Sequence, residues 1–194
     1  MSKRSWDQDT DMFGTEYTVT PARFIMALTW IIALMFVVLA AVISPVIYIT
    51  EGDLIGAIAF LLLIAGIGIP VFAVSWYYSP EKYTTSERGI TIIRPVGDIV
   101  IPIEEITKVE PKDYRSWKLL RTWGNGGLFS ISGKFWNKTD GSFWCYGKNN
   151  NFVMIHAKSK WVVTPDDMNL FITDVKGKMD KVKGRLDKGT RRSK

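Results

Sequence analysis

Cysteine and histidine are almost absent from this sequence. Cys145 and His156 are the only residues of their kinds among 194. A disulfide within the chain is therefore excluded, and so are metal centres built from several cysteine and histidine ligands. Both residues fall on neighbouring expected strands, so a nucleophile pair is conceivable, yet Cys145 alternates with Trp144 and Tyr146, a setting typical of a buried thiol. We expect no catalytic residue, no metal and no cofactor, and we expect that the chain is not an enzyme.

Two long segments lack charge. Asp, Glu, Lys, Arg and His are missing from Phe24 to Ile49 and again from Leu54 to Tyr78. As helices these segments would extend about 37–39 Å, more than the roughly 30 Å of bilayer hydrocarbon, which predicts tilt or fraying. Neither has the polar stripe of a soluble helix, and the first starts too late and is too long for a cleavable signal peptide. The missing charge argues against a transport or proton pathway.

The residues around these spans predict their orientation. Only Thr50 to Asp53 separates them, so we expect a tight antiparallel helical hairpin. Basic residues flank the pair on both sides, at Lys3, Arg4, Arg23, Lys82, Arg88 and Arg94. The positive-inside rule then predicts a multi-pass protein of the bacterial inner membrane with both termini in the cytoplasm. Residues 1–23 would form a leader and residues 24–78 the hairpin.

After Pro80 the pattern changes to short alternating apolar runs separated by turn residues, which is typical of an antiparallel β-domain. The expected strands are Lys82–Thr85, Ile90–Arg94, Ile99–Pro102, Ile106–Lys112, Leu128–Phe135, Ser142–Gly147, Phe152–Ala157 and Lys160–Thr164, with a long loop before Leu128. Thr164 is expected to cap a closing helix that has Pro165 at its first position. Its apolar face would comprise Met168, Phe171, Ile172, Val175, Met179, Val182 and Leu186.

From Tyr78 to about Lys176 the sequence resembles the bacterial pleckstrin-homology (PH) domains, in particular the membrane-anchored type that follows two N-terminal transmembrane helices. The resemblance is carried by Arg121, Gly124, Gly126-Gly127-Leu128-Phe129, Gly133-Lys134-Phe135 and Thr164-Pro165-Asp166-Asp167. It implies an α+β fold in which a PH-like antiparallel β-barrel, residues 79–176, is capped by a C-terminal amphipathic helix. Phosphoinositide binding in the wider superfamily uses clustered cations on the first two strands. Here Lys82, Arg88 and Arg94 are scattered, so that site is not carried over.

The stretch from Arg121 to Trp136 is rich in glycine and aromatic residues. In a phosphate-binding loop the glycines would lead into a helix, whereas Leu128 to Ile131 is strand-like. We therefore assign a structural role, either a positive φ angle or close backbone approach, to the glycines of this region. They are Gly124, Gly126, Gly127 and Gly133.

Cations and large aromatic side chains are mixed in the segment before these glycines. The candidate interaction surface consists of Lys108, Lys112, Arg115, Trp117, Lys118, Arg121 and Trp123. Such a mixture suits lipid headgroups or a protein partner, and a solvated loop is the alternative. Nucleic acid is not expected as a partner, because Glu110 and Asp113 dilute the charge and the domain is tethered to a membrane.

The net charge of +6 originates in the basic tail, residues 177–194. This tail is expected either to contact anionic lipid of the inner leaflet or to be a solvated, frayed terminus. The sequence thus predicts a membrane-anchored, non-catalytic interaction or scaffold module on the cytoplasmic face, with a protein partner whose identity is unknown. The alternatives are an accessory subunit of a membrane enzyme or transporter complex, and a lipid-sensing domain.

Overall fold

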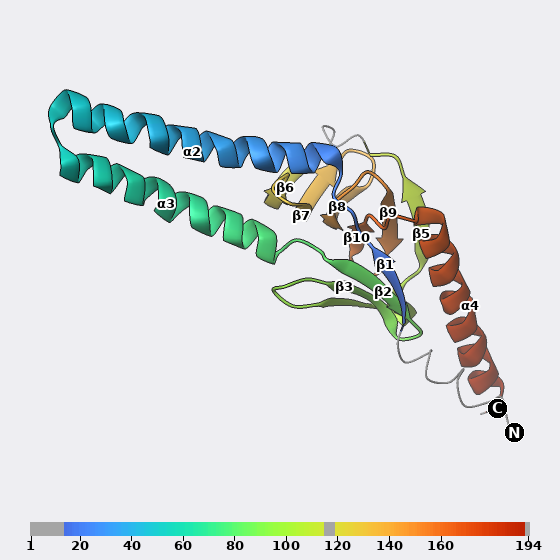
Figure 1. The fold of residues 1–194 in the computed structure, drawn as a ribbon. Coiled ribbons are helices and arrows are strands. Elements are labelled where there is room, and N and C mark those ends of the chain that lie inside the picture. The colour runs from blue at the N-terminus through green and yellow to red at the C-terminus, as the bar shows by residue number, and fades with distance from the viewer. Residues whose placement is uncertain (1–13, 115–118, 193–194) are drawn as a thin grey trace, which may run out of the picture.

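A long helical hairpin projects from a β-rich domain in the computed structural model, which describes residues 14–114 and 119–192 (Figure 1). The helices α2 (Arg23–Glu51) and α3 (Leu54–Tyr77) run antiparallel. Between them, Gly52 ends α2 with a φ angle of 66°. The Asp53 carboxylate then accepts a hydrogen bond of 2.9 Å from the Gly56 N–H and caps α3. The predicted hairpin is confirmed, with its turn at the acidic residues.

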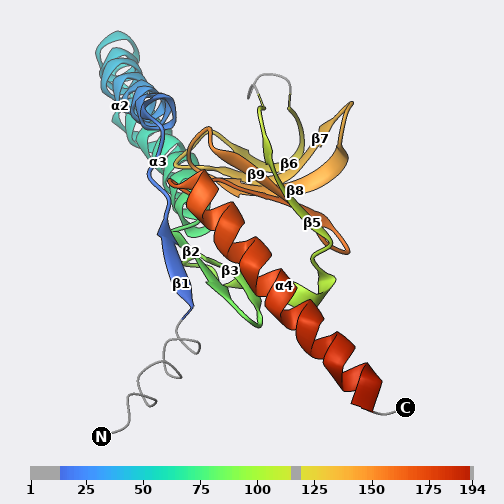
Figure 2. The same ribbon diagram turned by 90° about the vertical axis from the view of Figure 1, so that its right-hand side faces the viewer.

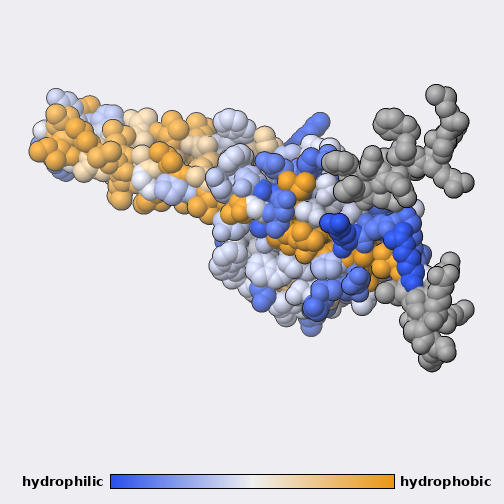
Figure 3. Space-filling model, turned by 90° about the horizontal axis from the view of Figure 1, so that it is seen from below, coloured by the Kyte–Doolittle hydropathy of each residue, from blue (hydrophilic) through white to orange (hydrophobic). Residues whose placement is uncertain are grey.

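The two helices pack against each other at a few points and expose most of their apolar surface. The Ser44 hydroxyl donates to the Ala57 carbonyl oxygen (2.9 Å), and the Phe36 ring contacts Phe72 edge to face and lies against Gly68. Both helices are long and apolar enough to cross a membrane, and only 11% of the most apolar window of each is buried. Apolar residues also dominate the hairpin surface in Figure 3, whereas the domain surface is largely hydrophilic.

The first sheet contains β1 (Thr15–Thr18), β2 (Lys82–Ser86), β3 (Gly89–Ile93) and β4 (Ile99–Pro102), antiparallel and in that order. Strand β1 was not predicted, because it is short and buries a single apolar side chain, Tyr17, within the expected leader. Thr18 pairs with Lys82. The strand that leads into α2 is therefore joined to the strand that follows α3.

The second sheet has the order β5-β9-β10-β8-β7-β6. Its strands are β5 (Lys108–Lys112), which follows the short 3-10 helix η1 (Ile103–Glu105), then β6 (Leu120–Gly126), β7 (Ile131–Asn137), β8 (Gly141–Gly147), β9 (Phe152–His156) and β10 (Lys160–Val163). Strand β10 pairs parallel with β8, and the other pairs are antiparallel. The domain is thus two sheets that do not close into one. The expected PH-like antiparallel β-barrel describes it only roughly, because the β8–β10 pair is parallel.

Two predictions about strands around Leu128 were wrong. The expected loop before Leu128 contains β6, and the expected strand from Leu128 begins only at Ile131. The chain turns between β6 and β7 at Gly127 to Ser130. Gly124 to Gly127 interrupt the apolar alternation, so the pattern gave no sign of a strand there.

Helix α4 (Met168–Arg192) crosses the open side between the sheets (Figure 2). Phe171, Ile172, Val175 and Met179 are buried in the core that the sheets share, and Met168 and Val182 pack at its edge, as predicted; Leu186 lies beyond the described side chains. The helix continues without a break past residue 177, so the division between domain and tail stays a prediction.

The cap of α4 differs from the prediction. The Asp167 carboxylate accepts from the Leu170 N–H (2.9 Å) and caps the helix. Thr164 was expected in this role, but it stays with the sheet. Its Oγ1 atom accepts from the Lys148 and Asn149 N–H groups at 2.9 and 3.3 Å, which otherwise would lack an acceptor at the end of β8.

A second core covers the opposite face of the six-stranded sheet. It contains Phe135, Phe143, Cys145, Phe152, Met154 and Val162, and Tyr114 and Leu119 pack against it. Ile25 from the first turn of α2 is buried in the same cluster. The beginning of the hairpin is therefore part of the hydrophobic core of the domain.

Candidate functional site

The structure separates the residues of the predicted interaction surface. Lys108 and Lys112 lie on β5, whereas Arg121 and Trp123 lie on β6, at the opposite edge of the six-stranded sheet. Arg115, Trp117 and Lys118 lie outside the described residues. The described members of the set therefore do not form one continuous cationic surface.

The cations on β5 form ion pairs with carboxylates of the domain. Lys112 pairs with Asp140 (2.9 Å) and Glu110 (3.1 Å), and Lys108 pairs with Glu110. Hydrogen bonds from Lys108, His156 and Lys112 lower the pKa of Glu110 to about 2. Burial by itself raises the pKa of Asp140, but hydrogen bonds from Tyr114, Lys112 and Asn137 outweigh it and lower that pKa. This cluster fastens strands together and is satisfied without a ligand.

The conceivable Cys145–His156 pair does not form. Cys145 is fully buried in the second core, and burial raises the pKa of its thiol. Across the sheet it faces Val162 and Gly133. The His156 ring contacts Glu110 instead, with 3.0 Å between Nε2 and Oε1.

Backbone geometry divides the four glycines assigned a structural role. Gly124 and Gly133 face each other across β6 and β7 with φ angles of 101° and 142°. A Cβ atom at Gly124 would lie 2.4 Å from the Ser132 oxygen. Gly126 and Gly127 have no positive φ. Gly127 instead permits close approach to α2, because a Cβ atom there would lie 2.7 Å from Leu28 Cδ2.

The tip of the β6–β7 hairpin, Gly127 to Ser130, contacts both long helices. The Phe129 N–H donates to the Thr29 hydroxyl of α2 (3.0 Å). The Phe129 ring meets the Phe72 ring of α3 edge to face, with 6.0 Å between centroids. The side chain of Asn125 shapes the tip, since it bonds to the backbone of Gly127 and Leu128. A phosphate-binding loop leads into a helix, whereas the strand β7 follows this turn. Residues 127–130 therefore lack the geometry of such a loop.

The segment between β1 and α2 is also tied to the domain. The Asp166 carboxylate accepts from the Thr18 hydroxyl (2.9 Å) and from the hydroxyl and N–H of Thr20 (2.7 and 2.8 Å). The Ala22 N–H donates to the Lys148 carbonyl oxygen (2.6 Å). Together with the β1–β2 pairing, these bonds hold both ends of the helical hairpin against the domain.

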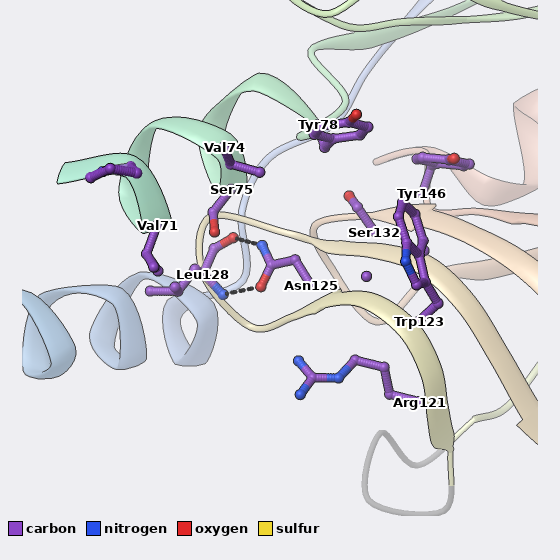
Figure 4. A pocket seen from close by; sticks show the side chains of 13 residues that line it. Val71, Val74, Ser75, Tyr78, Arg121, Trp123, Asn125, Leu128, Ser132 and Tyr146 are labelled. Carbon is purple, nitrogen blue, oxygen red and sulfur yellow. Dashed lines mark hydrogen bonds between the residues drawn. The ribbon is translucent and has the colours of Figure 1, made fainter. Parts of the chain in front are cut away.

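A cavity of about 610 Å³ lies at this junction, between α3 and the β6–β7 hairpin (Figure 4). Its lining includes Val71, Val74 and Ser75 of α3, Tyr78 directly after α3, Trp123, Asn125, Leu128 and Ser132 of the β-hairpin, and Tyr146 of β8. The lining is mainly apolar and aromatic, with a few hydroxyl and amide groups. Arg121 also borders the cavity, but its guanidinium lies on the other side of β6 from Ser132 and Tyr146 (Figure 4).

One cation lies over the tyrosines of the cavity, and another, Lys148, follows Tyr146 by two residues in the chain. The guanidinium carbon of Arg94 is 4.9 Å from the Tyr146 ring centroid and 5.9 Å from that of Tyr78. Lys148 is half-buried, and burial lowers the pKa of its ammonium group although Glu81 opposes this. Among the residues that the structure describes, neither cation forms an ion pair with a carboxylate.

Sequence reasoning missed this junction, although one signal for it was present. Trp76, Tyr77 and Tyr78 end the second apolar segment, and such aromatic residues mark the boundary between membrane and water. The basic tail was expected either to contact anionic lipid or to be a solvated terminus, and the end of α4 lies on the side of the domain away from the hairpin (Figure 1). This arrangement does not favour contact between the tail and the bilayer that the hairpin would cross.

The β-rich domain matches a known protein family. The family model for the bacterial PH domain matches residues 81–179, from the start of β2 into α4. No curated protein matches the chain, and no solved structure matches it. The match covers half of the chain and contains both sheets except β1, with the closing helix that the resemblance implied. The chain belongs to the bacterial PH domain family, and it carries two long apolar helices in front of that domain.

Proposed function

We propose that this protein is a membrane-anchored, non-catalytic interaction module, in which the helical hairpin holds the PH-like domain against the cytoplasmic face of the bacterial inner membrane. The observation that carries the proposal is the double contact of Phe129 with Thr29 of α2 and Phe72 of α3. Only the residues between Tyr77 and Lys82 link α3 to β2. The domain is thus presented to partners in a fixed orientation instead of swinging on a linker.

Aromatic side chains support a bilayer boundary at the junction. Trp30 on α2 and Trp76 and Tyr77 on α3 are exposed near the domain, and Tyr48 is exposed near the far turn. The rise from Trp30 to Tyr48 is about 27 Å, close to the roughly 30 Å of hydrocarbon. The first apolar span is longer than the hydrocarbon layer requires. Its first turns, including the buried Ile25 and Thr29, pack against the domain and need not lie in the bilayer.

Charge supports the cytoplasmic orientation. Arg23, Arg94 and Lys148 lie at the junction, whereas Glu51 and Asp53 lie at the opposite turn. Basic residues remain preferentially on the cytoplasmic side. The division of the chain into leader, hairpin, domain and tail stays a proposal. Strand β1, within the leader, pairs with β2 of the domain.

The outer part of the β6–β7 hairpin is the surface that we propose for a protein partner. Leu120 and Trp136 are cross-strand neighbours and are 61% and 42% exposed, and Trp123 is 59% exposed. Exposed tryptophan beside leucine on a sheet suits the buried centre of a protein interface. An accessory subunit of a larger membrane complex would use the same surface.

Photocrosslinking in cells tests this function. A photoreactive residue at Trp136 is expected to give a discrete crosslinked product, and one at Leu170, an exposed apolar position on α4, serves as the matched control. Identical products at both positions, or none at Trp136, would contradict the proposed partner surface. The anchoring is tested separately by extraction, since an integral protein stays in the membrane at high salt and alkaline pH.

A further inference from the structure

We propose that the cavity between α3 and the β6–β7 hairpin binds one anionic phospholipid of the surrounding bilayer, with part of an acyl chain inside the cavity and the headgroup phosphate at Arg94 and Lys148. This inference rests on the proposed function, because it requires α2 and α3 to cross a bilayer. The walls of the cavity come from α3, β6, β7 and β8 and not from the first two strands of the domain. Arg94, directly after β3, is the one residue that the site shares with the scattered cations of those strands.

The position of the cavity brings lipid to its opening. One wall extends from Pro70 of α3 to Tyr78, directly after the helix, and therefore crosses the boundary marked by Trp76 and Tyr77. Val74 borders the cavity and is still 57% exposed. Apolar surface thus continues from the lipid-facing side of α3 into the cavity, and an acyl chain can enter sideways without crossing water.

The chemistry of the lining changes along the cavity in the order that a phospholipid requires. Val71, Val74 and Leu128 provide apolar surface at one end of the cavity, and Tyr78 and Tyr146 lie at the other end (Figure 4). The Arg94 guanidinium lies over both tyrosine rings. The Ser75 and Ser132 hydroxyls lie between these walls, where ester oxygens need donors, whereas the Asn125 amide is bonded to the backbone of the β6–β7 tip. A volume of about 610 Å³ accommodates a drug-sized group, so the cavity holds part of a lipid rather than all of it.

The cations select a negative headgroup. Arg94 is held over the Tyr146 and Tyr78 rings, and its Nε atom donates to the Gly97 carbonyl oxygen (3.0 Å), so the guanidinium is already positioned. The Val96 N–H donates to the Tyr77 carbonyl oxygen (3.1 Å), which fixes the β3–β4 turn at the end of α3. Lys148, directly after β8 and two residues beyond Tyr146, adds a second, half-buried charge. Charge-assisted bonds to phosphate would compensate both groups.

Native mass spectrometry of the full-length protein tests the site after exchange into mixed phosphatidylglycerol and phosphatidylcholine. We expect one retained phosphatidylglycerol per chain. Val71→Trp narrows the cavity and should lower that adduct at least tenfold, whereas Ile69→Trp, on α3 but outside the lining and 69% exposed, should retain it. Arg94→Gln should reduce the preference for phosphatidylglycerol, and Arg88→Gln on the β2–β3 turn should not.

Several outcomes would overturn the inference. They are equal adducts in Val71→Trp and Ile69→Trp, equal retention of both lipids by the wild type, and a cavity that holds only detergent or a protein segment. Failure of the lipid site is distinguishable from failure of the proposed function. In the first case Val71→Trp remains membrane-integrated and still crosslinks from position 136, and in the second the wild type itself is extracted from the membrane or gives no specific crosslink.

Discussion

Gly124 and Gly133 require glycine for their backbone geometry, whereas the nearby Gly126 does not. The sequence indicated a structural role for four glycines, but it could not say which of them has positive φ, because that depends on the pairing of β6 with β7. Each of these two glycines approaches the backbone of the opposite strand, at Ser132 and Trp123 respectively. Gly126 lacks both features and has only the flexible Arg121 side chain nearby.

We therefore expect Gly124→Ala to lower the free energy of unfolding by about 1 kcal/mol or more, because an alanine at positive φ is strained. Gly126→Ala should change it much less. Thermal unfolding of the full-length protein in detergent, followed by tryptophan fluorescence, measures both. Equal melting temperatures for the two variants would contradict the assignment, and addition of nucleotide should shift neither.

Glu110 illustrates a residue whose role depends on its neighbours in space. Lys108, His156 and Lys112 stabilise its charged form and lower its pKa from 4.5 to about 2. A lowered carboxyl pKa contributes stability above the unfolded pKa, and this contribution is lost as the pH falls through the folded pKa. Glu110→Gln should thus be less stable than the wild type at pH 7, and the difference should shrink between about pH 4.5 and pH 2.

Urea unfolding across this pH range measures that difference. Glu104→Gln provides the control, because Glu104 is an exposed carboxylate on η1. A destabilisation by Glu110→Gln that stays constant down to pH 2 would indicate a packing effect instead of the ionic cluster.

Among the elements, those with regular apolar patterns were predictable and those defined by a partner were not. The long helices and the apolar face of α4 follow from composition and periodicity. Strand β1 and strand β6 are both edge strands, one short and one interrupted by glycine, and each is a strand because its neighbour supplies hydrogen bonds. Thr164 and Asp167 both have side chains that can cap a helix. Asp167 caps α4, because the Thr164 hydroxyl already accepts hydrogen bonds from the Lys148 and Asn149 N–H groups.

The β6–β7 tip gives a prediction at the same scale. Thr29→Val removes the acceptor of the Phe129 N–H and leaves a partly buried donor unpaired, which costs about 1 kcal/mol. Thr29→Ser retains the hydroxyl and is the matched control. Hydrogen exchange followed by mass spectrometry should show faster exchange of residues 127–130 in the valine variant only. Unchanged protection in that variant would mean that the tip is not fastened to α2 by this bond.

At the scale of the whole molecule, the candidate site was out of reach of sequence reasoning because its parts are far apart in the chain. Tyr78, Trp123 and Tyr146 become neighbours only when the second helix returns to the six-stranded sheet. The predicted cluster from Lys108 to Trp123 was compact in sequence, yet the order of strands places its two described parts on opposite edges. Proximity along the chain was therefore a poor guide to proximity on this surface.

Orientation in the membrane gives a prediction for the complete protein. In a Cys145→Ala background, cysteines at Gly52 and at Thr139, an exposed residue between β7 and β8, report opposite ends of the molecule. An impermeant thiol reagent added to intact spheroplasts should label position 52 and spare position 139. Labelling of 139 alone would reverse the orientation. Thr139 is preferred to Asp140, whose carboxylate bonds to Tyr114 and Lys112.

The direction of α4 leads to a prediction about the basic tail. Each Lys or Arg held near an anionic surface gains about 1 kcal/mol, so a tail beside the bilayer would be strongly attracted. Charge near such a surface acts within about 10 Å at ordinary ionic strength. The end of α4 lies on the side of the domain opposite the hairpin (Figure 1). Val96, by contrast, is hydrogen-bonded to Tyr77 at the end of α3.

Fluorophores at positions 96 and 192 of the full-length protein, in bilayers with a headgroup quencher, distinguish these environments. We expect quenching at Val96 and little at Arg192, with no change at Arg192 when phosphatidylglycerol replaces phosphatidylcholine. Strong quenching at Arg192 that salt relieves would show that the tail folds back to lipid by electrostatic attraction. The expected result would leave the basic end of α4 directed away from the bilayer, where an acidic protein surface can reach it.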